Sequence, residues 1–68
     1  MTLDEALLDA HARDDRAQLV ALYTKAADQA ATTDATCFFL TQAYVFALET
    51  GDPATPVLFN RLKDYGRV

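Results

Sequence analysis

The amino-acid sequence predicts an all-α protein of four short antiparallel helices, arranged as two helix–turn–helix hairpins or as a small bundle. Three observations lead to this prediction. Apolar residues recur at three- and four-residue steps, and no segment alternates with a period of two. The chain holds only two glycines and two prolines, and they stand where helical patterns end or begin. The intervening turns are short, which favours antiparallel neighbours.

The first helix is expected over residues 3–12. Thr2 and Glu5 have the Thr-x-x-Glu spacing of a capping box, in which each side chain satisfies a free amide of the first turn. Its expected apolar face consists of Leu3, Ala6, Leu7 and Ala10. The second helix is expected to begin near Asp14 or Asp15, because Asp15 and Gln18 repeat the capping spacing. Its expected buried residues are Leu19, Leu22, Tyr23, Ala26, Ala27 and Ala30, with Val20 at the margin.

The third helix is expected over residues 35–50, with Thr33 or Asp34 as its N-terminal cap. Its apolar residues point in nearly every direction: Cys37, Phe38, Phe39, Leu40, Ala43, Tyr44, Val45, Phe46, Ala47 and Leu48. A helix that is apolar all round is central in a bundle or shared with another chain.

The fourth helix is expected from Pro53 or Pro56 to about Tyr65. Its expected inner face and margin consist of Val57, Leu58, Arg61, Leu62 and Tyr65. Gly51 and Gly66 follow the third and fourth patterns, where a left-handed C-terminal cap is expected.

Residues 1–68 therefore form a single helical domain, with one hairpin over about 2–31 and the other over about 33–66. A shift of 37 positions maps one hairpin onto the other and aligns six identical pairs. They are Leu3 with Leu40, Ala6 with Ala43, Ala10 with Ala47, Asp15 with Asp52, Ala17 with Ala54, and Val20 with Val57. The two hairpins are thus of similar design.

The pattern Leu40-x-x-Ala43-Tyr44-x-x-Ala47 followed by Gly51-Asp52 resembles the first helix and turn of a tetratricopeptide repeat. The earlier run Leu3-x-x-Ala6-Leu7-x-x-Ala10 is a looser match. The resemblance implies hairpins that stack and bind peptides or partner proteins along a concave face. Two repeats are fewer than the three usually needed for a stable stack, so a second copy is expected to supply the missing packing. The chain also resembles small helical proteins of alphaproteobacteria that carry no assigned activity.

Charge and hydropathy exclude several classes of function. The formal net charge is −4, whereas nucleic acids and anionic membrane surfaces attract clustered Lys and Arg. The longest apolar stretch, residues 35–48, extends about 21 Å as a helix, short of the roughly 30 Å hydrocarbon core. No basic signal-peptide start is present, and the single cysteine fits a reducing compartment, so a cytoplasmic location is expected.

No catalytic, cofactor or metal site is expected. His11 is the only histidine, and a helix-end surface position suits it better than a role in proton transfer or metal binding. Cys37 is flanked by Phe38 and Phe39, which favours a small buried hydrophobe over a reactive thiol. Helix capping and exposed faces account for most of the ten acids.

The charges at the two ends of the chain are uneven. Residues 1–15 carry five acids and one base, and residues 57–68 carry three bases and one acid. This asymmetry fits the dipoles of the first and last helices. Orientation of one chain against another is the alternative.

The aromatic residues are the expected binding surface. A bundle of four short helices does not readily enclose all of them, so one or two are expected to be exposed and covered by a partner. The candidate interface is Phe38, Phe39, Phe46, Tyr44 and Phe59. We therefore expect a non-catalytic protein–protein interaction module that forms a homodimer or binds a protein or peptide. A structural subunit of a larger complex and a small ligand-binding bundle are the alternatives.

Overall fold

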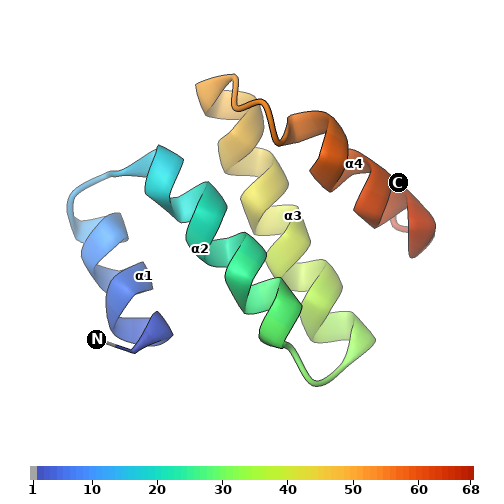
Figure 1. Ribbon diagram of the computed structural model, residues 1–68, viewed down its shortest axis with the longest axis horizontal. Helices are drawn as coiled ribbons and strands as arrows, with labels where there is room; N and C mark the ends of the chain where they lie inside the picture. Colours follow the sequence, from blue (N-terminus) through green and yellow to red (C-terminus); the bar gives the residue numbers. More distant parts are fainter. Residues whose placement is uncertain (1) are drawn as a thin grey trace.

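The computed structural model describes residues 2–68 and contains four α-helices (Figure 1). They are α1 (Leu3–Ala12), α2 (Arg16–Gln29), α3 (Thr33–Thr50) and α4 (Thr55–Asp64). No strand occurs in the described part of the chain, so the predicted all-α class is confirmed.

Side-chain caps begin the first two helices at the residues that the sequence predicts. The Thr2 hydroxyl accepts a hydrogen bond from the Glu5 amide at 3.2 Å, and the Glu5 carboxylate accepts one from the Thr2 amide, which completes the capping box. The Asp15 carboxylate accepts a hydrogen bond from the Gln18 amide at 3.2 Å and begins α2. Between the two helices, Asp14 adopts a left-handed φ of 52°, which aspartate tolerates better than most residues.

The start of α3 differs from the prediction. The helix begins at Thr33, and the cap is Thr32, whose hydroxyl accepts a hydrogen bond from the Ala35 amide at 3.1 Å. Three consecutive residues, Thr32 to Asp34, are all good capping residues, so sequence preference alone does not choose among them. Asp34 lies inside the first turn, where its charge suits the helix dipole.

Helix α4 begins at Thr55, between the two predicted starts, with Pro56 in its first turn and no side-chain cap, and it ends at Asp64, one residue before Tyr65. Of the residues predicted for its inner face and margin, Leu58 and Leu62 are buried, whereas Val57 and Tyr65 are 58% and 44% exposed. Gly51 and Gly66 both adopt the predicted left-handed conformation, with φ of 65° and 73°.

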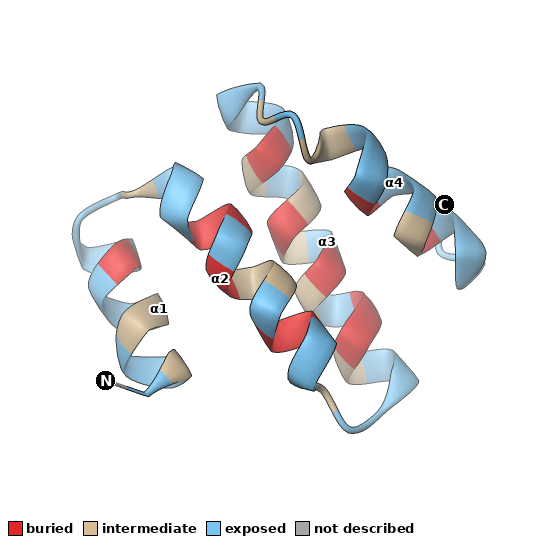
Figure 2. Cartoon of the chain, viewed as in Figure 1, coloured by how far each residue is buried: buried red, intermediate tan, exposed pale blue. Residues whose placement is uncertain are grey.

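Each helix packs on its neighbour in sequence: α1 on α2, α2 on α3, and α3 on α4. In Figure 1, α1 and α4 accordingly lie on opposite sides of the central α2–α3 pair. The Cα trace measures 32 × 28 × 12 Å. A Cα trace of two stacked helical layers is about 13–15 Å thick and that of a single layer about 5 Å, so the helices here are staggered rather than stacked in two full layers. Every helix consequently keeps one side exposed, as the burial colours in Figure 2 show.

The core divides into two clusters of buried residues. The larger lies among α2, α3 and α4 and contains Val20, Ala27, Leu40, Ala43, Ala47, Leu58 and Leu62. The smaller lies between α1 and α2 and contains Ala10, Leu19 and Leu22. Val20 is only 3% exposed and belongs to the larger cluster, so its predicted marginal position is wrong. Tyr23 and Phe46 pack against both clusters.

Two arginines near the C-terminus pair with acids of the same chain. Arg61 contacts Asp28 of α2 at 2.8 Å, and Arg67 contacts Asp34 of α3 at 2.7 Å. The basic C-terminal charges therefore hold α4 and the last residues against the central helices.

Candidate protein interface

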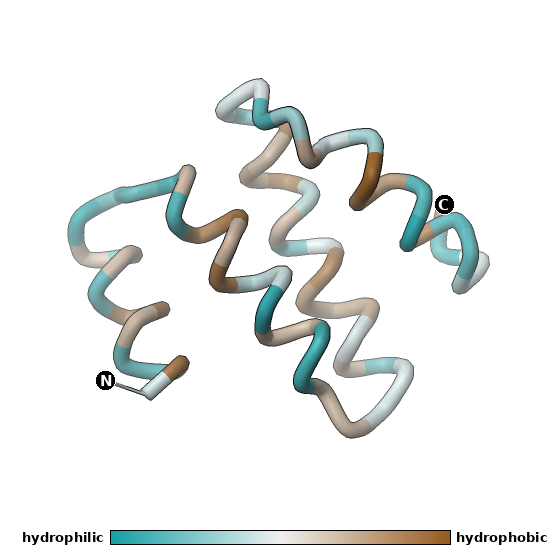
Figure 3. Tube along the Cα trace, viewed as in Figure 1, coloured by the Kyte–Doolittle hydropathy of each residue, from teal (hydrophilic) through white to brown (hydrophobic). Residues whose placement is uncertain are grey.

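A row of uncharged residues lies on the exposed side of α3. Phe38, Val45 and Leu48 are 57%, 43% and 55% exposed, and Thr41 is also exposed. Their spacings of three, four and seven residues place them on one side of the helix, opposite the fully buried Ala43. Figure 3 shows that α3 is mostly pale to brown along its length, whereas the α1–α2 connection is hydrophilic.

The row continues onto α4. Tyr44 is half-buried and lies one turn before Leu48 on α3. Its ring centroid is 6.0 Å from that of Phe59, which is 39% exposed. We call the exposed set Phe38, Val45, Leu48 and Phe59 the outer apolar face.

Charged residues flank the outer apolar face and do not interrupt its α3 row. Asp34 lies one turn before Phe38 and pairs with Arg67 at 2.7 Å. Glu49 follows Leu48 and contacts Arg16 of α2 at 3.6 Å. An apolar centre with a polar rim is the usual anatomy of a protein–protein interface.

Of the five aromatic residues predicted as the interface, the structure places two on this surface and three against other side chains. Phe38 and Phe59 are exposed, and Tyr44 packs on Phe59. Phe39 and Phe46 are half-buried and stack on Tyr23 of α2 at centroid distances of 6.3 and 6.0 Å.

Three of the seven aromatic side chains are exposed, rather than the expected one or two, because Tyr65 joins Phe38 and Phe59. Val45 and Leu48 are surface residues that the predicted interface does not include. Val45 follows Phe38 by seven residues, which is about two helical turns. This spacing is the sequence feature that predicts a place for both residues on the same side of α3.

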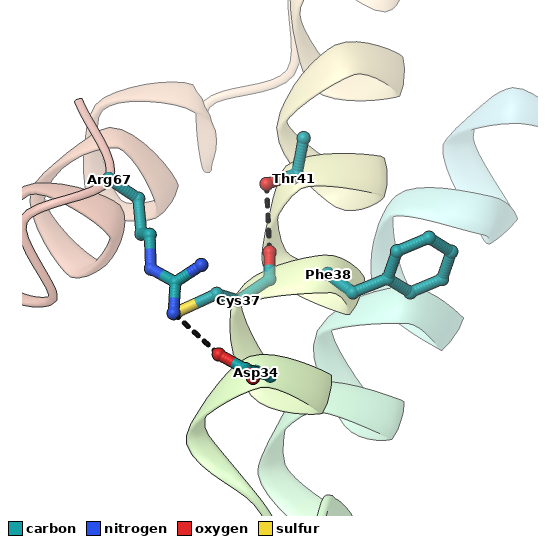
Figure 4. A pocket seen from close by; sticks show the side chains of 5 residues that line it. All are labelled: Asp34, Cys37, Phe38, Thr41 and Arg67. Carbon is teal, nitrogen blue, oxygen red and sulfur yellow. Dashed lines mark hydrogen bonds and ion pairs between the residues drawn. The ribbon is translucent and has the colours of Figure 1, made fainter.

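A hollow of about 260 Å³ lies where the C-terminal residues meet α3 (Figure 4). Arg67 lies over Cys37 and binds Asp34, while the Phe38 ring points away from it. The hydrogen bond to Asp34, together with the nearby Cys37, raises the pKa of Arg67 above its usual value. Cys37 is 3% exposed, and its carbonyl accepts a hydrogen bond from Thr41 at 2.8 Å.

His11 does not lie beside Cys37. The His11 Nε2 atom is 2.8 Å from the Tyr23 hydroxyl, and the ring packs edge-on against Phe46 at 6.0 Å. Phe46 is nine residues along α3 from Cys37, a separation of about 13 Å. The one imidazole and the one thiol are thus too far apart for a nucleophile–base pair.

His11 is exposed in the last turn of α1, where a positive charge suits the helix dipole. The described residues contain no group of three or more His, Cys, Asp or Glu side chains placed to hold a metal ion. Among residues 2–68, no helix combines the length and the apolar character needed to cross a membrane.

Comparison of this chain with protein-family models, with curated proteins and with solved structures finds no match.

Proposed function

We propose that this chain is a small cytoplasmic protein–protein interaction module that has no catalytic activity and self-associates through the outer apolar face. The observation that carries the proposal is the exposed row Phe38, Val45 and Leu48 on a helix whose opposite side is fully buried. An interface core depleted of charge and rich in aromatic residues distinguishes binding surfaces from ordinary surface.

The position of the apolar residues supports this proposal, whereas the total exposed area does not bear on it. The accessible surface is 4240 Å², and a compact monomer of this mass is expected to expose about 4,200 Å². The exposed area is therefore that of an ordinary compact monomer. A standard interface buries roughly 800 Å² per partner, about a fifth of this surface. The outer apolar face with its polar rim on α3 and α4 supplies the centre of such an area.

Two sequence features support the remaining parts of the proposal. The single cysteine forms no intrachain disulfide, as is usual for cytoplasmic proteins. The resemblance of the hairpins to tetratricopeptide repeats suggests that a second copy extends a two-repeat stack. A structural subunit of a larger complex would use the same face for a different protein.

Sedimentation velocity across a wide range of protein concentration tests self-association. We expect the wild-type chain to reach twice its monomer mass and Val45→Glu to remain monomeric, because the substitution buries a charge at the centre of the interface. The matched control is Ala21→Glu, which adds the same charge at an exposed position of α2. It should leave self-association unchanged.

The results distinguish self-association from binding of a different protein. A wild-type chain that stays monomeric at the highest concentration rejects self-association. If that monomer also binds no partner through Val45, as judged by comparing pull-downs with wild type and Val45→Glu, the interaction function is rejected as well.

A further inference from the structure

A groove of about 370 Å³ lies between the first two helices, away from the helices that carry the outer apolar face. Its lining comes from Asp4, Leu7, Leu8 and His11 of α1 and from Tyr23 of α2. None of these residues belongs to the outer apolar face.

The walls of the groove are held in place before any ligand arrives. The His11 Nε2 atom and the Tyr23 hydroxyl are 2.8 Å apart, and the Tyr23 ring stacks almost parallel on Phe46, with an interplanar angle of 6°. Leu7 packs against the smaller core cluster. Binding to such a surface requires little ordering of side chains, which favours affinity.

The rim of the groove offers apolar surface that the fold does not use. Leu8 is 70% exposed, the highest value among the large apolar residues of the described chain. It lies in the middle of α1 and lines the groove with the neighbouring Leu7. An apolar side chain that packs here removes the exposed surface of Leu8 from water.

The charge at the groove selects for a cation. Asp4 contributes a carboxylate to the lining, and the described lining residues include no lysine or arginine. The one basic residue among them is His11, whose Nε2 atom lies 2.8 Å from the Tyr23 hydroxyl. Arg13, which follows α1, is paired with Asp9 at 3.0 Å and with Asp15 at 3.7 Å.

The volume distinguishes a peptide from a cofactor. Pockets for small ligands occupy about 300–1,000 Å³, and this groove is near the lower limit. It therefore has room for one or two side chains rather than for a large cofactor.

We infer that the α1–α2 groove is a second binding site, which takes a peptide segment carrying a Lys or Arg beside a large aliphatic residue. The aliphatic side chain packs on Leu7 and Leu8, and the cation lies near Asp4. The inference does not depend on self-association, and it gives one chain two separate binding surfaces.

A titration followed by ¹H–¹⁵N NMR tests this site. The probe is the acetylated and amidated peptide Gly-Lys-Leu-Leu-Lys-Gly, added up to millimolar concentration. We expect the largest shift changes at Leu7, His11 and Tyr23. The same peptide with Glu in place of Lys, and a third with Ser in place of Leu, should each bind more weakly.

Matched variants assign the two contacts. Leu8→Ser should weaken binding roughly tenfold, as loss of a buried aliphatic contact does, whereas Val57→Ser on α4, which removes a similarly exposed residue, should not. Asp4→Asn should weaken binding about threefold and reduce its salt dependence, as for an exposed charge pair. Asp64→Asn, at the end of α4, is the charge control.

Three outcomes would overturn the inference: no shift changes at millimolar peptide, equal binding of the Lys and Glu peptides, or shift changes confined to α3 and α4. Repeating the titration with Val45→Glu separates the two proposals. Loss of self-association with unchanged peptide binding supports the groove, and loss of both rejects it as an independent site.

Discussion

At the scale of single residues, the ends of the helices follow from local chemistry. Thr2, Asp15 and Thr32 each accept a hydrogen bond from an amide of the first turn that follows. These interactions span three residues, so the sequence alone predicts the first two. The third was misplaced by one residue because adjacent threonines compete for the same role.

Gly51 provides a direct test of one such end. It terminates α3 with φ of 65°, and a Cβ atom added there meets nothing within 4 Å. We expect Gly51→Ala to lower the free energy of unfolding by about 1 kcal/mol, because an L-residue is strained in this conformation even without a clash. Urea denaturation measures the loss.

Gly66 is the control for this prediction. It has a similar φ of 73° and equally open surroundings, but it lies only two residues from the C-terminus. Strain there is relieved by fraying of the last residues, so Gly66→Ala should cost less. An equal loss at both positions would contradict the explanation.

The rate at which the Cys37 thiol reacts tests whether burial protects it from reagents in solution. At 3% exposure beneath Arg67, its thiol should react with a water-soluble disulfide reagent far more slowly in the native chain than in 6 M guanidinium chloride. The Arg67→Ala variant should speed the native reaction by opening the hollow that Arg67 lines. Native labelling as fast as in denaturant would contradict the buried position.

At the scale of the helix, α3 shows what periodicity cannot determine. Its residues are apolar on nearly every side, so no single face is marked as inner, and the sequence predicted only a central or shared helix. Packing against both α2 and α4 selects the row Leu40, Ala43 and Ala47 as the buried side. The pairs Arg61–Asp28 and Arg67–Asp34, each 33 residues apart, were also beyond prediction, since only the tertiary fold brings them together.

The same substitution made at a buried and at an exposed leucine of α3 tests this assignment. Leu40 is 0% exposed, and Leu40→Ala should cost about 2–5 kcal/mol by leaving a cavity. A domain of this size has roughly 3–10 kcal/mol of stability in total, so the loss should be a large fraction of it. Leu48 is 55% exposed, and Leu48→Ala should change the monomer by no more than about 0.5 kcal/mol.

Thermal unfolding of dilute, monomeric samples makes the comparison. Dilution matters because Leu48 belongs to the outer apolar face, and an associated sample would report the interface as well. Similar losses for the two variants would mean that α3 buries a different side.

At the scale of the whole molecule, each helix packs only on its neighbours in sequence, and this serial arrangement explains why the core is divided. The smaller cluster joins α1 to α2, the larger joins α2 to α3 and α4, and α1 and α3 make no direct backbone approach. Tyr23 and Phe46 contact both clusters. The sequence predicts two hairpins of similar design and includes Phe46 in the candidate interface, but aromatic composition does not reveal that Phe46 has internal neighbours in both clusters.

The link between the clusters leads to a prediction about local unfolding. Phe46 stacks on Tyr23, packs against His11 and belongs to both clusters, whereas Phe39 stacks on Tyr23 but belongs only to the larger. We expect Phe46→Ala to lower the hydrogen-exchange protection of α1 more than that of α3, because α1 then keeps only its contacts with α2.

Phe39→Ala removes the same type of side chain from the same helix. It should lower protection in α2, α3 and α4 without selectively exposing α1. If both variants lower protection evenly over all four helices, the two clusters unfold as one cooperative unit and Phe46 does not link them.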